Sequence, residues 1–132
     1  MQNRKKILIA LGSFKDVFNP AESINLIEKL LLNANENFDI TSISIADGGE
    51  YSYEVVKENL NCVEVSVKNV VTPYKQQVNS SYLILDSGIA FISSSHILRL
   101  GDDFEEFKNP LSLTSFGLGQ LVKHAVLKSK VT

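Results

Sequence analysis

Residues 43–50 read ISIADGGE, and this stretch decides how the rest of the chain is organised. An alternating apolar run ends in an aspartate, two glycines and a glutamate, and a helix-like pattern begins at Tyr51. In an open α/β sheet, ligands bind just beyond the carboxyl end of a strand, where the next helix starts. Gly48 and Gly49 can adopt positive φ and turn backbone N–H groups toward an anion. The alternative is a plain strand-to-helix turn that Asp47 or a neighbour caps.

The segments around this stretch predict alternating strands and helices. Residues 5–11 (KKILIAL) are almost continuously apolar after two lysines, as in a strand buried on both faces of a parallel sheet. Asn19 and Pro20 suit the cap and the first position of a helix that should end near residues 33–37. A second strand follows at 38–45 and a second helix at 51–60. This order of strand, helix, strand and helix favours a parallel core with right-handed crossovers.

The second half of the chain has a different pattern. Alternating runs separated by Thr-Pro-Tyr and Asp-Ser-Gly turns predict an antiparallel meander with strands at 62–71, 76–85 and 89–93. A charged segment at 99–110 should be mostly loop, and a last helix should run from about Gly117 to Lys128. The predicted fold class is therefore α/β, with a Rossmann-like start, an antiparallel meander and a final helix. We expect one α/β unit over 1–132, made of a parallel part (1–61) and a meander part (62–132).

The composition of the 132-residue chain excludes several classes of protein. It is 44% hydrophobic and 21% charged with a formal net charge of −2, and its lysines and arginines are scattered, so nucleic-acid binding is not expected. The single cysteine, Cys62, excludes a disulfide framework and a thiolate zinc site. No apolar run approaches membrane-spanning length. The apolar part of the basic N-terminus covers only residues 7–11, which suits a first strand better than a signal peptide, so we expect a cytoplasmic protein.

Two loops offer groups for phosphoryl chemistry. Ser13 and Lys15 follow the first strand, and a hydroxyl and an ammonium at a helix entrance can hold a phosphate or a carboxylate. Asp47 and Glu50 supply carboxylates that can bind a metal ion or accept a proton. If the first two strands are parallel neighbours, Lys15 and Asp47 can face one cleft, which provides two of the parts that phosphoryl transfer requires. The alternative is that Lys15 is an ordinary solvated lysine.

A third loop precedes the last helix and is a possible anion-binding site. Thr114, Ser115, Gly117 and Gly119 place two hydroxyls and two glycines at a helix start. The spacing is not a dinucleotide fingerprint, because Val122 stands where the third glycine belongs. It is not a Walker loop either, since no Gly-Lys-Ser/Thr follows.

Taken in order, these loops resemble those of the bacterial glycerate kinases. The resemblance rests on SFK at 13–15, ADGGE at 46–50, VTP at 71–73, NPL at 109–111 and TSFGLGQL at 114–121, and it covers about Lys5 to Lys128. Members of this family are two-domain α/β enzymes that phosphorylate glycerate with ATP and magnesium. The resemblance therefore implies glycerate as substrate and ATP and Mg²⁺ as cofactors, with no metal ligand assigned in this chain.

The resemblance also implies the residues of the substrate cleft. It places Lys15 and Asp47 there, and their chemistry suggests their roles: Lys15 would hold an anion, and Asp47 would act on the glycerate hydroxyl or on the metal. The other positions that match the family motifs would line the substrate cleft: Ser13, Gly48, Gly49 and Glu50.

Several departures from the family pattern point to an incomplete kinase. Gly12 and Asp16 replace an aspartate and a glycine, Tyr51 replaces a glycine, and SSSH at 93–96 replaces an acidic Glu-Met-Ala segment. The family also continues into a glycine-rich segment beyond the last helix of this chain. We therefore expect the chain to correspond to the N-terminal part of a larger two-domain kinase, without autonomous activity. The alternative is an inactive homologue or a truncated fragment that acts as a binding or interaction module. We expect either self-association or a second chain that supplies the missing half of the kinase.

Overall fold

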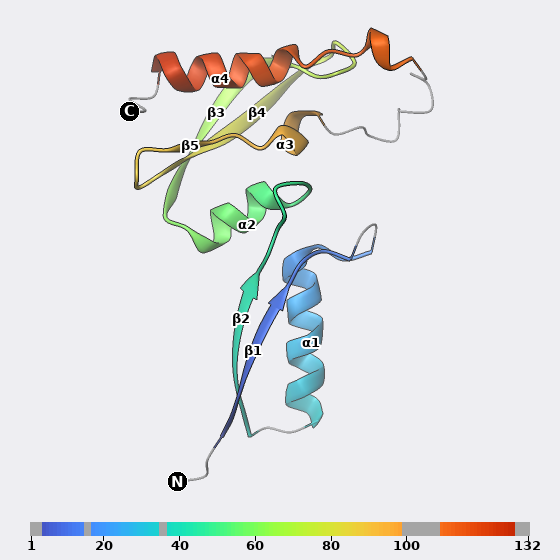
Figure 1. Ribbon diagram of the computed structural model, residues 1–132, viewed down its shortest axis with the longest axis vertical. Helices are drawn as coiled ribbons and strands as arrows, with labels where there is room; N and C mark the ends of the chain where they lie inside the picture. Colours follow the sequence, from blue (N-terminus) through green and yellow to red (C-terminus); the bar gives the residue numbers. More distant parts are fainter. Residues whose placement is uncertain (1–3, 15–16, 35–36, 99–108, 129–132) are drawn as a thin grey trace. The chain divides into compact units, whose positions relative to one another are not determined.

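The computed structural model describes residues 4–14, 17–34, 37–98 and 109–128. Contacts within the chain divide it into two compact units, 1–59 and 60–132 (Figure 1). The sequence placed a change of architecture two residues further on, at 61/62. That the two parts act as a single unit remains a prediction.

The N-terminal unit is the strand–helix–strand–helix arrangement that the sequence predicts. It contains β1 (Lys5–Leu11), α1 (Pro20–Ala34), β2 (Phe38–Ser44) and α2 (Ser52–Asn59). The two strands pair in parallel, from Lys5 opposite Phe38 to Leu11 opposite Ser44. The parallel core is therefore confirmed, and the loops that follow β1 and β2 leave the sheet at the same edge.

Helix α1 begins with a capping box. The Asn19 side chain accepts a hydrogen bond from the Glu22 backbone N–H at 2.8 Å, and the Glu22 carboxylate accepts one from the Asn19 N–H at 2.9 Å. The helix packs against both strands, and Ile9 of β1, Ile24 of α1 and Tyr53 of α2 are buried. The predicted start of this helix is thus confirmed, with the cap at the expected asparagine.

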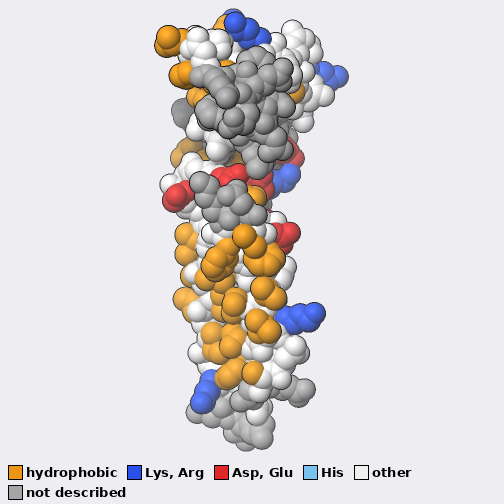
Figure 2. Space-filling model, turned by 90° about the vertical axis from the view of Figure 1, so that its right-hand side faces the viewer, with side chains coloured by type: hydrophobic (Ala, Val, Ile, Leu, Met, Phe, Trp, Pro, Cys, Tyr) orange, Lys and Arg blue, Asp and Glu red, His pale blue; other side chains and the backbone are white. Residues whose placement is uncertain are grey.

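Many apolar side chains of the N-terminal unit lie at its surface. On α1, Leu26, Leu30 and Leu32 are each about half exposed. Figure 2 views the molecule from the side of α1 and shows hydrophobic side chains gathered along this unit. The two strands and two helices of this small unit therefore leave part of its apolar surface uncovered.

The C-terminal unit is an antiparallel meander with helices. Strands β3 (Cys62–Val71), β4 (Gln77–Leu85) and β5 (Ala90–Phe91) pair in the order β3-β4-β5. They are followed by the short helix α3 (Ser94–Leu98), a 3₁₀ turn, η2 (Pro110–Ser112), and α4 (Phe116–Lys128). The meander and the final helix are confirmed. The last strand is shorter than the predicted 89–93. Helix α3 begins at Ser94, directly after the predicted end of that strand.

The core of this unit forms where α4 packs on the sheet. Its buried members come from β3, β4, α3 and α4 and are Val67, Val70, Tyr82, Ile97, Leu121 and Ala125. Leu121 and Ala125 are four residues apart, so they lie on one face of α4, as helical spacing requires.

A β-bulge in β3 fixes the position of α4. The pairing register between β3 and β4 shifts between Val67 and Val70, and Asn69 adopts a φ of 57°. The Gln120 side chain accepts a hydrogen bond from the Val71 N–H at 2.8 Å and donates one to the Asn69 carbonyl at 3.3 Å. The helix therefore satisfies backbone groups at the bulge and next to it.

Two expectations from composition also concern the fold. Among the residues described, no helix is long and apolar enough to cross a membrane. Most of the charged segment predicted at 99–110 lies outside the described residues. Of its last two residues, Pro110 is the first residue of η2 and Asn109 is its N-cap. The Asn109 side chain accepts a hydrogen bond from the Leu111 N–H at 3.0 Å.

Candidate functional site

The candidate site lies at the edge of the sheet where β1 and β2 end. The Ile45 N–H donates a hydrogen bond to the Leu11 carbonyl at 2.9 Å, so the parallel pairing extends one residue beyond β2. Both loops then leave the strands side by side. This is the arrangement expected for a ligand site in an open α/β sheet.

A small cavity of about 270 Å³ lies between these two loops. Ser13 comes from the loop after β1, while Asp47 and Glu50 come from the turn after β2. The described residues that line it are Gly12, Ser13, Ile45, Ala46, Asp47 and Glu50. Three of the predicted site residues are therefore brought together around one space, and their side chains carry a hydroxyl and two carboxylates.

The glycines of the turn shape it without lining the cavity. Gly48 has a φ of 96°, a conformation that side chains other than glycine rarely adopt. The Gly49 N–H donates a hydrogen bond to Oδ1 of Asp47 at 2.9 Å. This bond orients the Asp47 carboxylate through one of its two oxygens.

The loop after β1 closes into a tight turn. The Phe14 N–H donates to the Phe18 carbonyl at 2.9 Å, and the Phe18 N–H donates back to the Phe14 carbonyl at 3.0 Å. Phe14 and Val17 are more than half exposed at this turn. Lys15, the predicted anion-holding cation, lies outside the described residues, so its role remains a prediction.

Two features of the site were noted in the sequence only as departures from the family pattern. Gly12, which stands where the resemblance implies an aspartate, lines the cavity. Tyr51, which stands where it implies a glycine, has a φ of 62°. The backbone at Tyr51 adopts a left-handed conformation, which costs a non-glycine residue about 1 kcal/mol or more. The sequence signal for this conformation at Tyr51 is that the family pattern implies a glycine there.

The loop before α4 places its predicted anion-binding residues in different roles. The Thr114 hydroxyl accepts a hydrogen bond from the Phe116 N–H at 3.1 Å and so helps to cap the helix. Gly117 is buried against β3. Ser115 and Gly119 line two shallow grooves along α4, of about 570 and 790 Å³. Anion binding at this loop remains a prediction.

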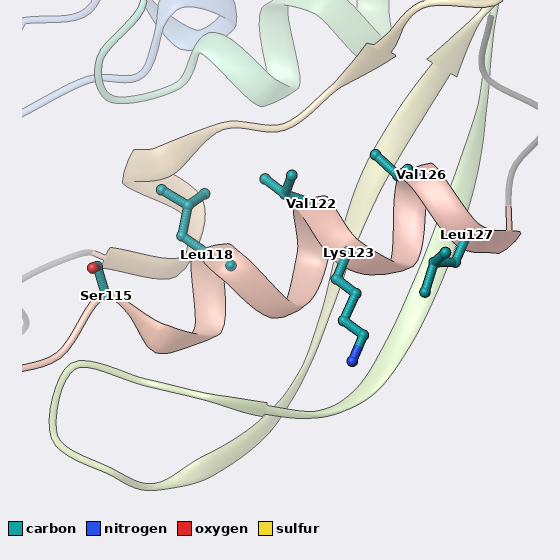
Figure 3. Close-up of a pocket in the computed structure, with 7 residues that line it drawn as sticks. Ser115, Leu118, Val122, Lys123, Val126 and Leu127 are labelled. Atoms are coloured by element: carbon teal, nitrogen blue, oxygen red, sulfur yellow. The ribbon is translucent and has the colours of Figure 1, made fainter.

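The smaller groove has a mostly apolar lining. Leu118, Val122 and Val126 follow one side of α4, and Lys123 and Leu127 lie on the other (Figure 3). Among the described residues that line it, Lys123 alone is charged.

The described residues contain no cluster of three or more His, Cys, Asp or Glu side chains that could hold a metal ion. His124, one of the two histidines, forms a hydrogen bond between its Nδ1 and the hydroxyl of the buried Tyr82 at 3.2 Å. Asp47 and Glu50 are thus two carboxylates beside a cavity, which is fewer than a metal site made only of protein ligands needs.

The fold and this cavity define a class: an α/β protein with a candidate small-molecule site at the carboxyl ends of two parallel strands. A family model for the glycerate kinase family matches residues 7–132. The chain belongs to the glycerate kinase family.

Individual relatives agree with this assignment. The chain is 31% identical over 122 residues to glycerate 2-kinase of Escherichia coli K12, and 24% identical over 121 residues to glycerate kinase of Neisseria meningitidis serogroup B. Each alignment covers 92% of this chain and 32% of the relative. A crystal structure assigned as glycerate kinase 2 from Salmonella typhimurium LT2 matches with a TM-score of 0.72 at 30% identity, over 94% of this chain and 33% of that one. The chain therefore spans about a third of the length of these relatives.

Proposed function

We propose that this chain supplies the glycerate-binding turn for ATP-dependent phosphorylation of glycerate. The observation that supports this proposal is the cavity that brings Ser13, Asp47 and Glu50 together at the end of the parallel strands. Its volume of about 270 Å³ suits a three-carbon hydroxy acid better than a nucleotide.

Each group at the cavity has a chemical role in this proposal. The second oxygen of Asp47 accepts a hydrogen bond from the glycerate hydroxyl and can take its proton as phosphoryl transfer proceeds. The Ser13 hydroxyl and the backbone of Gly48 and Gly49 bind the remaining oxygens of the substrate. Lys15 pairs with the glycerate carboxylate or with the transferred phosphate.

The cofactors would be ATP and Mg²⁺. Magnesium is commonly held by one or two protein carboxylates together with phosphate oxygens, and Asp47 and Glu50 suit that requirement. ATP supplies the phosphoryl group, and the chain carries no Walker loop to cradle it. The residues on this chain therefore belong to the acceptor side of the reaction.

Phosphoryl transfer requires donor, metal and acceptor within contact distance. Since the chain spans about a third of the length of its relatives, we propose that further polypeptide completes the kinase and that the chain alone is inactive. We also propose a cytoplasmic location, where glycerate and ATP meet.

A second candidate function is that of an inactive homologue that binds a partner without catalysis. Gly12 at the cavity favours it, because the carboxylate implied by the family pattern is missing there. Tyr51 favours it too, since a bulky side chain replaces a glycine beside the turn.

Isothermal titration of the chain with glycerate, and separately with magnesium-ATP, tests the proposal. We expect heat with glycerate that is lost in Asp47→Asn and Lys15→Ala. The matched control is Asp86→Asn, which removes an exposed carboxylate from the turn between β4 and β5. Absence of heat with glycerate in the unaltered chain would overturn the proposal and favour the inactive homologue.

A further inference from the structure

One face of the β1–β2 sheet is not covered by α1. Burial alternates along both strands, and the more exposed set includes Leu8 at 70%, Ile43 at 44% and Ile45 at 48%. The register places Leu8 opposite Thr41 and Ala10 opposite Ile43, so these side chains share one surface. We call this surface, formed by Leu8, Ala10, Thr41, Ile43 and Ile45, the open sheet face.

The open sheet face has a polar end and an apolar end. Lys6 and Asp39 are paired in the register on this same side, at the start of the strands. The aliphatic residues follow toward the carboxyl ends, and Ile45 also lines the candidate substrate cavity. Whatever covers the apolar end of this face therefore borders the cavity.

An antiparallel sheet can expose one face to solvent, whereas parallel sheets rarely do. Their crossover helices cover both faces, so parallel strands are almost always buried on both sides. A second copy of this chain that presented its own open sheet face would stack sheet on sheet, which is the packing of β-sandwiches rather than of parallel α/β proteins. The chemistry of the open sheet face thus calls for an amphipathic helix with an aliphatic face.

The relatives indicate where such a helix comes from. Each alignment leaves about two thirds of the relative outside the match, while it covers more than nine tenths of this chain. We infer that the open sheet face is the docking surface for that remaining portion of a glycerate kinase polypeptide. This inference rests on family membership and on the sheet, and not on glycerate binding.

The test is co-expression of the full 132-residue chain, carrying an affinity tag, with the two thirds of E. coli glycerate 2-kinase that it does not match. We expect the two polypeptides to purify together as a 1:1 complex. Leu8→Lys and Ile43→Lys should each weaken the complex by about tenfold or more, because each would bury an unpaired charge.

Val63→Lys is the matched control, since Val63 is 65% exposed on β3 in the C-terminal unit. It should leave the complex intact. All three variants alone should melt like the unaltered chain, because each changes an exposed side chain. This comparison separates a docking defect from a folding defect.

Three outcomes would overturn the inference. They are the absence of a complex, a complex that Leu8→Lys and Ile43→Lys leave unchanged, and a homodimer in sedimentation equilibrium that Leu8→Lys dissociates. The last would assign the open sheet face to a second copy of the chain. A complex that forms but does not bind glycerate would overturn the proposed function alone.

Discussion

Gly117 lies so close to Val71 that a Cβ at this position would overlap the Val71 carbonyl oxygen. The same Cβ would lie 3.0 Å from the Val71 carbonyl carbon and 3.1 Å from Cγ1 of Val70. Gly117 stands in the first turn of α4, and Val71 ends β3. The absence of a side chain therefore sets how closely the helix approaches the sheet.

The first prediction follows from that approach. Gly117→Ala should lower the free energy of unfolding of the C-terminal unit by about 3 kcal/mol, because backbone must move to admit the methyl group. Gly119→Ala is the matched control two residues along the same helix, where an added Cβ meets nothing within 4 Å. It should raise stability by about 1 kcal/mol through helix propensity. Urea unfolding followed by circular dichroism measures both, and equal effects would contradict the packing role.

Tyr51 gives a second paired prediction. Tyr51→Gly and Tyr51→Ala both remove the aromatic ring, so they lose the same side-chain contacts. At a φ of 62°, the glycine variant should be the more stable of the two by about 1 kcal/mol. Thermal unfolding of the two variants measures the difference. An alanine variant at least as stable as the glycine variant would show that the left-handed conformation at residue 51 is not retained.

The sequence was most informative where local chemistry and hydrophobic period agree. The start of α1 follows from Asn19, Pro20 and Glu22, because a cap, a helix-starting proline and an acidic first turn act within four residues. The parallel pairing of β1 and β2 follows from the order strand, helix, strand, helix and from the continuous apolar run of the first strand. The Asp47–Glu50 turn was recognisable because it stands between a strand and a helix.

The features that the sequence did not reveal depend on contacts between distant residues. The bulge at Asn69 and its hydrogen bonds to Gln120 join positions 51 residues apart, which no local pattern encodes. The packing of Gly117 on β3 likewise depends on a contact between distant residues. From the sequence alone, a glycine at the start of a helix indicates an anion-binding site instead. The short helix at Ser94–Leu98 was missed because its run of serines resembles a loop.

Gln120 carries the third prediction. Gln120→Ala removes the acceptor for the Val71 N–H and the donor to the Asn69 carbonyl. Because these are part-buried or bulge groups that lose their partner, stability should fall by about 1–2 kcal/mol. Lys123→Ala, an exposed position one turn along α4, should change it by less than about 0.5 kcal/mol. Denaturant unfolding of both variants measures this, and similar losses would contradict the link between helix and bulge.

The capping box of α1 provides the fourth prediction. Asn19→Ala should lower the stability of the N-terminal unit by about 1 kcal/mol, since the Glu22 N–H loses its acceptor. Glu22→Ala removes the reciprocal bond to the Asn19 N–H. The double variant should cost less than the sum of the two single variants, because each single change already breaks the reciprocal arrangement. Strict additivity in a double-mutant cycle would indicate that the two bonds act independently.

The last prediction separates the shape of the turn from its chemistry. A Cβ at Gly49 would lie 3.0 Å from Oδ1 of Asp47, so Gly49→Ala should displace the carboxylate while the backbone stays permitted. We expect glycerate affinity to fall by about tenfold with little change in stability, as one oriented hydrogen bond to a charged group is worth about 1.5 kcal/mol or more. Gly48→Ala meets no neighbour within 4 Å but holds a φ of 96°, so it should instead lower stability by about 1–2 kcal/mol. Calorimetric titration with glycerate and thermal unfolding of both variants test the pair. If Gly49→Ala bound glycerate as tightly as the unaltered chain, the orientation of Asp47 would not be what binds the substrate.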